Sequence, residues 1–329
     1  MSSSHMAPPL DVELRPGRTP VLHVRLTTDA PSWVAQQRDA LRAAVTQHGA
    51  VLVRGLGLRT AEEVAAVFQG LGTGLMAERE AFAPRTSYVE GVYSSTKWPA
   101  NQPMCMHNEL SYTLEVPSLM LFACLTPPAS GGVTGVADST VVMSRLPQEL
   151  VQRFAREGWT LVRNYNDEIG ASYADAFGTD DRGAVEAYCR ANSIEFEWRP
   201  DGGLRPRQRR HALVGHPVTR QACWFNQIAF LNEWTMDPDV HEYLVDAYGA
   251  ENLPFTTCFG GGEPVGADIV ELLNEVYDAN TLREPWQAGD LMLVDNVRMA
   301  HSREPYEGDR EVLVGMSAPL RMPVPGVAR

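Results

Sequence analysis

The spacing of apolar residues near the start of the chain predicts two amphipathic helices. The first is expected to run from Ser32, a residue type that caps helices, to His48, with Gly49 ending it. A capping box, Thr60-Ala-Glu-Glu63, opens the second helix. Both carry apolar residues three and four positions apart: Val34, Leu41 and Val45 in the first, and Val64, Val67, Phe68 and Leu71 in the second. We expect these stripes to pack on a sheet, which gives both helices a structural role.

Most of the remaining chain has the pattern of short strands separated by turn residues. Strands are expected at 10–26, 51–53, 119–125, 222–227, 290–295 and 310–316. Further helices are expected at 148–157, 183–192, 237–248 and 267–279. Many strands, with helices at the start of the chain and in insertions, are typical of a double-sheet jelly roll. The predicted fold class is therefore mainly β with helical additions.

Two stretches lack a regular period. Residues 85–112 are loop-rich, as expected of a segment that forms a site on a rigid scaffold. Residues 165–181 are punctuated by glycine and are expected to form a mobile lid, within an insertion at about 165–215. No repeat or linker divides the chain, so residues 7–329 are expected to form a single domain. Residues 1–6 resemble an expression-vector remnant and are excluded from this interpretation.

The composition narrows the class of protein. The 329 residues are 44% hydrophobic, which is enough for one large domain with a substantial core. A net charge of −13 argues against a nucleic-acid partner, because phosphates are bound by basic surfaces. No signal peptide is recognisable, and no apolar run is long enough to span a bilayer, so we expect no membrane partner. The five cysteines show no CxxC spacing, and we therefore expect a reduced, cytoplasmic protein.

His107 and Glu109 form the strongest candidate for chemistry. In an extended chain, residues two apart project from the same face, so an imidazole and a carboxylate are presented side by side. A second imidazole would complete the 2-His-1-carboxylate set, which leaves three positions open on ferrous iron. His301 is the expected third ligand, because an apolar strand ends in a polar turn just before it. A His-x-Glu pair alone has little specificity, so the interpretation depends on the surrounding motifs.

Ordered motifs flank both parts of this candidate site. Upstream lie His48–Gly55, Pro84-Arg85-Thr86 and Gly91–Thr96; after His107 come Gly131-Gly-Val-Thr134 and Ala137-Asp-Ser139; after His301 comes Pro305–Arg310. In these motifs the chain resembles the taurine dioxygenase/clavaminate synthase superfamily of Fe(II)/2-oxoglutarate oxygenases, from about His48 to Met316. It is most similar to the branch that tailors amino acids and nonribosomal peptides, typified by the syringomycin-pathway aspartyl hydroxylase.

The resemblance implies a double-stranded β-helix and a dioxygenase that uses Fe(II), 2-oxoglutarate and O2. In such enzymes 2-oxoglutarate is decarboxylated to succinate and CO2 while a substrate C–H bond is oxidised. Related halogenases have Gly or Ala where this chain has Glu109, so the carboxylate favours oxygen transfer over halogenation. Hydroxylation of an amino acid or amino-acid-derived compound in a natural-product pathway is the expected outcome. Desaturation, epoxidation and ring closure use the same three ligands and stay open.

Two residues are implied as the binding site of the cosubstrate. Arg310 lies where the family places the arginine that binds the distal carboxylate of 2-oxoglutarate, and guanidinium suits a planar bidentate contact. Thr134 is implied as its hydroxyl partner; a turn threonine with only a local hydrogen bond is the alternative. The taurine enzyme carries a second arginine where this chain has Val314, so the C1 carboxylate lacks an obvious partner. Arg298 and Arg303 are available substitutes by position only.

Substrate-binding residues are predicted from segments that line the cleft in similar enzymes. The candidates are Arg85, Ser94, Asn108, Trp224, Phe225 and Asn226. Since neighbours on a strand face opposite ways, only one of Trp224 and Phe225 is expected in the pocket. A local arginine run, at 205, 207, 209 and 210, is either a solvated face or a surface for an anionic substrate or carrier-protein arm. The sequence sets neither the substrate nor the oligomeric state.

Two further classes of function compete with the oxygenase. Zinc accepts the same His/Glu/His ligands, so a non-redox zinc enzyme is one alternative. A metal-free binding protein on the same fold is the other, because a fold does not fix function. The zinc enzyme would have no use for Arg310 and Thr134, and the binding protein would not need the metal ligands.

Overall fold

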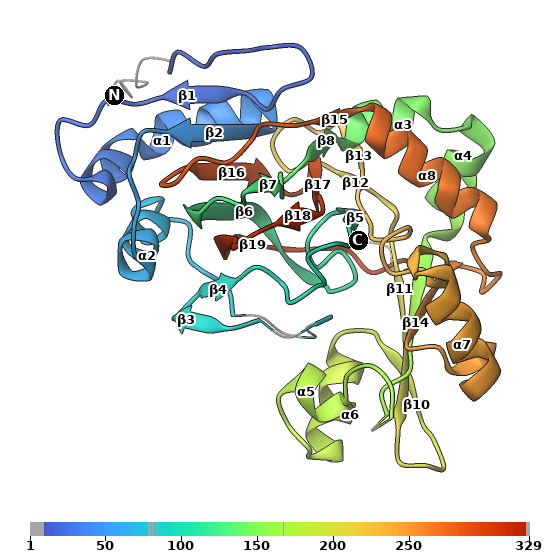
Figure 1. Cartoon of the computed structure of the whole chain (residues 1–329). Coiled ribbons are helices and arrows are strands. Elements are labelled where there is room, and N and C mark those ends of the chain that lie inside the picture. The colour runs from blue at the N-terminus through green and yellow to red at the C-terminus, as the bar shows by residue number, and fades with distance from the viewer. Residues whose placement is uncertain (1–9, 78–79, 81, 84, 167, 327–329) are drawn as a thin grey trace, which may run out of the picture.

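A computed structural model describes residues 10–77, 80, 82–83, 85–166 and 168–326. The predicted vector remnant at 1–6 lies outside these residues. Two sheets face each other in the main body, a third sheet continues toward a smaller helical lobe, and α1 and α2 cover the outer face of the largest sheet (Figure 1).

Seven strands form the largest sheet, and all pairs are antiparallel except β1 with β2. In spatial order they are β1 (Val21–His23), β2 (Ala50–Arg54), β16 (Leu291–Asp295), β6 (Glu115–Thr126), β19 (Glu311–Arg321), β4 (Val92–Ser94) and β3 (Ser87–Val89). Strand alternation divides the core. In β16, Leu291 and Leu293 face the helices, whereas Met292 and Val294 face the interior between the sheets.

The facing sheet is smaller and carries two of the candidate metal ligands. Its strands are β15 (Thr281–Leu282), β8 (Val136–Asp138), β17 (Met299–Arg303) and β5 (Met104–His107), all antiparallel. Two short ladders complete the body: β18 (Tyr306–Glu307) with β7 (Ser130–Gly131), and β12 (Leu213–Gly215) with β13 (Ala222–Trp224). The apolar interior between the two large sheets is the space into which both histidines project.

The two N-terminal helices form as predicted, with one correction. Helix α1 (Ala30–His48) is capped by Asp29, whose side chain accepts from the Ser32 backbone N–H at 2.9 Å, so Ser32 lies inside the helix. Helix α2 (Ala61–Gly70) is capped by Thr60 as the capping box indicates. The strand expected at 10–26 is wrong in extent, because β1 is the strand found there and Glu13 adds only an isolated bridge to Val21.

Four of the remaining described helices lie close to their predicted bounds, and the two at 139–145 and 173–177 were not predicted from the sequence. The six are α3 (Ser139–Arg145), α4 (Gln148–Glu157), α5 (Tyr173–Phe177), α6 (Arg182–Ala191), α7 (Pro238–Tyr248) and α8 (Ala267–Ala279), with 3-10 turns at Glu233–Thr235 and Ala250–Asn252. Of the described helices, none is both long and apolar enough to cross a bilayer.

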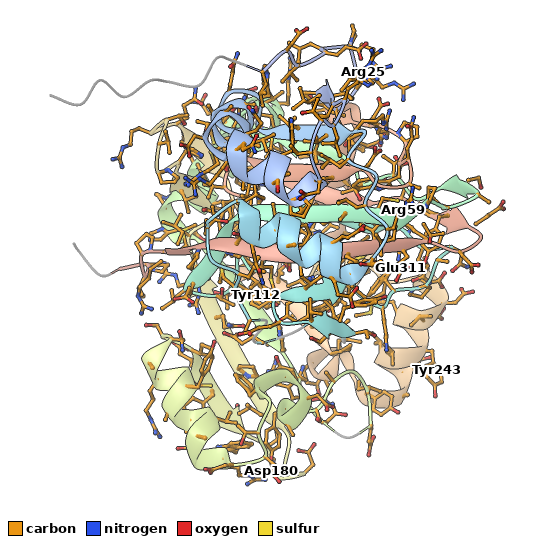
Figure 2. The ribbon with its side chains drawn as sticks, turned by 90° about the vertical axis from the view of Figure 1, so that its left-hand side faces the viewer. Arg25, Arg59, Tyr112, Asp180, Tyr243 and Glu311 are labelled. Carbon is orange, nitrogen blue, oxygen red and sulfur yellow. The ribbon has the colours of Figure 1, made fainter. Side chains whose placement is uncertain are left out.

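The predicted insertion divides into two structurally different parts. Helices α5 and α6 form a lobe with its own small apolar cluster, seen around Asp180 in Figure 2. The second part belongs to a four-stranded sheet of β10 (Glu195–Trp198), β11 (Leu204–Arg210), β9 (Trp159–Arg163) and β14 (Phe255–Phe259). Because β11 lies between β10 and β9, this part is fixed in the body, and a lid role stays a prediction for 165–181 alone.

Candidate active site

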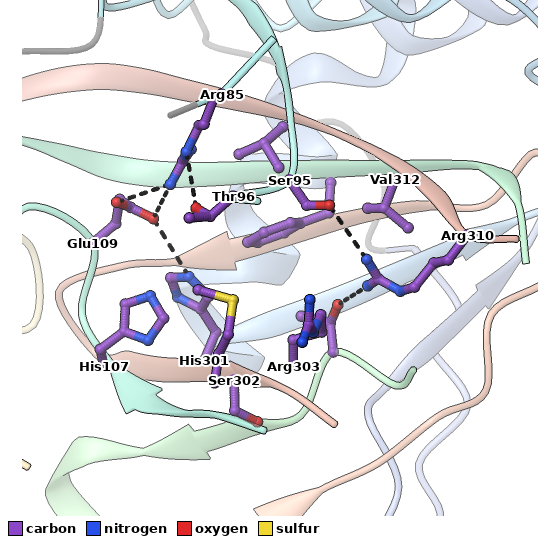
Figure 3. Close-up of a pocket in the computed structure, with 14 residues that line it drawn as sticks. Arg85, Ser95, Thr96, His107, Glu109, His301, Ser302, Arg303, Arg310 and Val312 are labelled. Carbon is purple, nitrogen blue, oxygen red and sulfur yellow. Dashed lines mark hydrogen bonds and ion pairs between the residues drawn. The ribbon is translucent and has the colours of Figure 1, made fainter. Parts of the chain in front are cut away.

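The three predicted metal ligands meet in the interior between the sheets. His107 ends β5 and is the paired residue of His301 on β17, while Glu109 lies in the turn that follows β5. One ligand atom from each of the three lies within 4.8 Å of the others (Figure 3). All three side chains are buried, at 5%, 6% and 5% exposure for His107, Glu109 and His301. Two imidazoles and one carboxylate at this spacing fit the facial ligand set of ferrous iron.

The protonation states of the triad suit a cation. Burial, together with the neighbouring His301, lowers the pKa of His107 to about 3, so this imidazole is neutral at pH 7. Its Nδ1 lies 2.8 Å from the Cys105 carbonyl, which fixes Nδ1 as the donor and leaves Nε2 for a metal. Burial alone would raise the pKa of Glu109, but Arg85 and the two imidazoles hold that pKa well below its usual range. The Glu109 carboxylate is therefore ionised and supplies a negative charge for a cation.

Aromatic rings enclose the two imidazoles. Phe230 stacks on His107 with ring centres 4.5 Å apart, and Phe122 meets His301 edge-on at 5.2 Å. These apolar contacts fix the ring planes and keep water from one side of the site. The site is thus rigid before any ligand binds, which lowers the cost of assembling it.

The turn that carries Glu109 is held by an asparagine network. Asn296 accepts from the Glu109 N–H at 2.7 Å and donates to the Glu109 carbonyl at 3.0 Å, so one side chain fixes both backbone groups of the ligand. Leu110, the next residue, has φ 53°, a left-handed conformation that is unfavourable for a branched side chain. The network maintains this strained turn, and with it the direction of the carboxylate.

Asn108 and Asn226 belong to this network and not to a substrate pocket. Asn108 is fully buried and donates to the carbonyls of Asn296 and Met299 at 2.7 and 3.2 Å. Its side-chain oxygen accepts from the Asn226 N–H, and Asn226 donates to the Ala212 carbonyl. The predicted substrate role is therefore corrected for both: buried amides here satisfy backbone groups around the ligand turn.

Trp224 and Phe225 also lie in the core, which corrects the expectation that one of them faces the pocket. Their side chains are 0% and 1% exposed. Trp224 packs edge-on against Phe154 with ring centres 5.4 Å apart. Strand β13 ends at Trp224, and the Phe225 N–H bonds to the Ala212 carbonyl. Both faces of this segment are covered by protein, so the alternation rule does not expose either ring.

The predicted cosubstrate residues lie together in the cavity beside the triad. Arg310 donates through Nε to the Gly132 carbonyl at 3.0 Å, through Nη2 to Thr134 Oγ1 at 3.3 Å and through Nη1 to Ser95 Oγ at 3.5 Å. Gly132 is favoured beside it, since its φ is 65° and a Cβ there would lie 2.7 Å from Pro128 Cγ. The same cavity is lined by His107, Glu109 and His301 (Figure 3).

The charge of Arg310 is unbalanced by the surrounding protein. Burial, then the nearby Arg303, lowers the pKa of Arg310 to about 10, which still leaves it charged at pH 7. Its guanidinium donates to one carbonyl and two hydroxyls, and no ion pair joins it to a carboxylate of the described residues. A buried guanidinium without a counter-charge is a favourable site for an anion, and a dicarboxylate such as 2-oxoglutarate fits this requirement.

The hydrogen bonds that Thr134 Oγ1 accepts determine where its hydroxyl can donate. Its Oγ1 accepts from Arg310 and also from the indole N–H of Trp286 at 3.3 Å. With both lone pairs used, the one hydroxyl proton is left as a donor toward the cavity. Trp286 was missed from the sequence because it stands in none of the flanking motifs, and Ser95 was missed because its neighbour Ser94 was chosen from the Gly91–Thr96 motif.

Ser94, a predicted substrate residue, does not line the cavity around Arg310, whereas its neighbour Ser95 does. Ser94 ends β4, and its hydroxyl accepts from the Thr86 N–H at 2.9 Å, away from the cavity. Ser95 lines the cavity and touches Arg310. Neighbouring residues face opposite ways, so a one-residue difference exchanges structural and cavity positions.

Arg85 lies between the triad and a large cleft. Its Nη2 is 3.2 Å and 3.3 Å from the two Glu109 oxygens, and its Nε donates to Thr96 Oγ1 at 3.1 Å. Of the two arginines near His301, Arg303 lines the cavity beside the triad and Arg298 is not among its lining residues. Arg298 pairs with Asp138, and Arg303 donates to carbonyls of the loop at 98–102. Because Arg303 Nε has no acceptor among the described residues, Arg303 stays the candidate partner in this cavity for the C1 carboxylate of a cosubstrate.

The cleft next to Arg85 has a volume of about 830 Å³. It lies between the 93–98 segment, the insertion at 170–178 and the edge of the third sheet at 163–165 and 254–255. A cavity nearer the triad shares Phe82, Ala83 and Arg85 with this cleft, so the two spaces are adjoining. Clefts of roughly 300–1,000 Å³ accommodate drug-sized ligands.

The predicted arginine run is divided by strand alternation. Arg210 is buried and donates to backbone carbonyls, including that of Tyr112 at 2.8 Å. Arg207 and Arg209 are exposed on the other face of β11. Strand β9 is the neighbour of β11 in the sheet, and its Arg163 lines the cleft. The exposed Arg207 and Arg209 therefore lie on the opposite face of the sheet, away from the cleft.

Comparison with known proteins decides the family. The family described as "Taurine catabolism dioxygenase TauD, TfdA family" matches residues 15–317, most of the chain. The chain belongs to this family. It is an oxygenase that depends on Fe(II), 2-oxoglutarate and O2, as the resemblance indicated, and the zinc and metal-free alternatives are set aside.

Two relatives of known description match over most of their length. Dapdiamide synthesis protein DdaC of Enterobacter agglomerans is 31% identical over 276 residues, 84% of each chain. A clavaminate synthase-like protein of Arabidopsis thaliana is 29% identical over 308 residues, 90% of this chain and 89% of that one. These matches do not assign the residues that bind metal, cosubstrate and substrate.

Solved structures confirm the predicted fold class. PvcB from Pseudomonas aeruginosa aligns over 97% of this chain and 98% of its own, with a TM-score of 0.56 and 14% identity. A taurine dioxygenase from Burkholderia xenovorans aligns over 96% and 90%, with a TM-score of 0.53 and 17% identity. At sequence identities this low, the similarity shows a shared fold and nothing more.

Proposed function

We propose that this oxygenase hydroxylates an unactivated C–H bond of an amino acid or amino-acid-derived compound, free or carrier-bound, with succinate and CO2 as co-products. His107, Glu109 and His301 would hold Fe(II), and Arg310 with Thr134 would hold 2-oxoglutarate. One observation carries the site assignment: a buried His/Glu/His set and an arginine without a counter-charge among the described residues line the same cavity.

Iron with its cosubstrate and O2 supplies the power to oxidise a C–H bond. The residues of the chain position the cosubstrate and exclude water. Arg310 and the Thr134 hydroxyl bind and orient a carboxylate, while Phe122 and Phe230 exclude water from the imidazoles. Arg85 orients the Glu109 carboxylate. This carboxylate would be the third protein ligand of the metal, and its presence favours hydroxylation over halogenation.

The substrate class is supported by two observations. The similar DdaC is described as a dapdiamide synthesis protein. The cleft beside Arg85 contains both signs of charge, with Lys97 and Asp175 at its exposed parts, as the ammonium and carboxylate of an amino acid require. Desaturation, epoxidation and cyclisation are alternative outcomes that product analysis would separate. We also infer a cytoplasmic location, which the five free cysteines favour.

Anaerobic titration of the apo protein with Fe(II) and 2-oxoglutarate tests the assignment. The chelate gives a weak visible charge-transfer band. We expect the band with the unchanged protein, its loss in His107→Ala, and its retention in Arg207→Ala, which removes an exposed arginine of the outer sheet face. A protein that binds iron and shows no band at any 2-oxoglutarate concentration would contradict the proposed function. Succinate release with candidate amino acids then identifies the substrate.

A further inference from the structure

One buried arginine in the large cleft is not used by the proposed cofactor chemistry. Arg163 ends β9 and is 3% exposed. Its Nη1 donates to the Tyr165 hydroxyl at 2.7 Å and to the Glu80 carbonyl at 3.1 Å. The ring of Tyr112 covers one face of the guanidinium, 4.3 Å from Cζ. These contacts fix the side chain in one orientation at the wall of the cleft.

The opposite edge of this guanidinium has no partner. Neither Nε nor Nη2 of Arg163 has an acceptor among the residues that the structure describes. The nearby Glu80 carboxylate is not an acceptor for these two atoms, because its oxygens accept from Tyr188 and from Gln208. Nε–H and Nη2–H lie on the same edge of a guanidinium and point in parallel, which is the arrangement that a carboxylate accepts with its two oxygens.

The other charged groups of the cleft favour the same ligand. Its described lining holds three cations, Arg85, Lys97 and Arg163, and one anion, Asp175. Lys97 has no ion pair with a described carboxylate. Arg85 pairs with Glu109, and Glu80 lies near Arg163, so Lys97 is the lining cation whose charge stays available to an added anion.

Aromatic side chains connect this edge of the cleft with the triad. Phe82 lies 5.1 Å from Phe255 and 5.4 Å from Phe230, between ring centres, and Phe230 stacks on His107. Trp98 adds a further ring, 6.1 Å from Phe82. A ligand anchored at Arg163 would therefore extend over an apolar wall before it reaches the metal site.

We propose that the oxygenase takes an extended substrate with a free carboxylate, which Arg163 binds through its Nε/Nη2 edge with help from Lys97, and with an apolar or acyl portion on the Phe82 wall. The proposal rests on the function proposed above and names the substrate class of the same site. Arg163 is thereby a specificity-determining residue. A free amino acid of small size would leave most of the 830 Å³ cleft unfilled.

Matched ligand pairs test this inference before the natural substrate is identified. N-acetyl-L-leucine, N-acetyl-L-phenylalanine and N-benzoylglycine are each titrated beside the corresponding primary amide. The readout is the shift of the Fe(II)–2-oxoglutarate band under anaerobic conditions. Since a charge-assisted pair is lost in the amide, we expect the carboxylates to half-saturate at concentrations at least about tenfold lower. Equal binding of both series, or carboxylates that leave the band unmoved, would contradict the proposal.

Variants then locate the anchor. Arg163→Met is expected to abolish the preference for carboxylates, and Arg163→Lys, which keeps a donor for the Glu80 carbonyl, to reduce it severalfold. Lys97→Gln is expected to give a smaller loss, and Arg207→Met, on the outer sheet face, none. A preference that persists in both Arg163 variants overturns the assignment. If Arg163→Met does not fold, Arg163→Lys and the unchanged protein decide the question.

The proposed function fails in a distinguishable way. Loss of the Fe(II)–2-oxoglutarate band from the unchanged protein would contradict the cofactor site, whatever the substrate. A normal band with equal affinity for carboxylates and amides would contradict only the Arg163 anchor.

Discussion

His107 and His301 face each other as paired residues on antiparallel strands β5 and β17, although most of the chain separates them in sequence. The metal site is thus a product of strand register. A slip of one residue would turn either imidazole to the opposite face of the sheet. The buried asparagines Asn296, between β16 and β17, and Asn108, after β5, maintain this register.

Asn296→Ala is expected to destabilise the fold by about 2–4 kcal/mol, because it leaves the Glu109 backbone groups and the Pro117 carbonyl without partners. It should also weaken Fe(II) binding, since the Glu109 turn loses its support. Urea unfolding and the anaerobic iron titration measure the two effects. Asn280→Ala, which removes one hydrogen bond at the end of α8, is the control. Unchanged iron affinity in a folded Asn296→Ala protein would show that the turn does not need this support.

Arg310→Met is expected to raise the 2-oxoglutarate concentration needed for half-saturation by about 10–100-fold, because a charge-assisted contact contributes about 1.5–3 kcal/mol. The iron affinity without cosubstrate should stay unchanged, since Arg310 donates to Gly132, Thr134 and Ser95 and not to the triad. Arg207→Met is the matched control. An equal loss in both variants would point to a general charge effect in place of a binding site.

Trp286→Phe removes the indole N–H that occupies one lone pair of Thr134 Oγ1. The hydroxyl proton can then turn away from the cavity, so 2-oxoglutarate affinity should fall by a few-fold, about 0.5–1.5 kcal/mol. Thr134→Val should have at least as large an effect, and combining the two changes should add little, since both act through one hydroxyl. Strictly additive losses would contradict this coupling.

Trp224→Ala is expected to lower the free energy of unfolding by about 3–5 kcal/mol, as for a large ring removed from a packed core. In the folded protein it should leave the affinities for iron and cosubstrate unchanged. Trp98→Ala removes a half-buried ring that lines the cleft, so it should have a smaller effect on stability and a larger effect on substrate binding. Urea unfolding and the band shift with carboxylate probes distinguish the two positions.

The cysteines are expected to be unreactive in the folded protein. Burial raises the pKa of Cys105 and Cys189 to about 11 and that of Cys124 and Cys223 to about 12, so at pH 8 these thiols are protonated and poor nucleophiles. A thiol reagent should therefore label none of them rapidly at pH 8, and all five in urea. Fewer than five thiols in urea would reveal a disulfide and argue against a reducing compartment.

Local patterns in the sequence were sufficient for much of the architecture. Helices α4 and α8 have the predicted bounds, since their apolar spacing and end signals depend only on neighbours along the chain. The His-x-Glu spacing and the motif around Arg310 likewise identified the residues that the fold brings together.

Only the tertiary structure decided which side chains face a cavity. Alternation defines two faces of a strand, but not which of them is covered by another part of the chain. Trp224 and Asn108 are therefore buried where a cleft was expected, and Ser95, for which the sequence predicted no role, lines the cavity beside Arg310. The unpaired edge of Arg163 depends on partners from separate segments of the chain, and such long-range contacts leave no local pattern in the sequence.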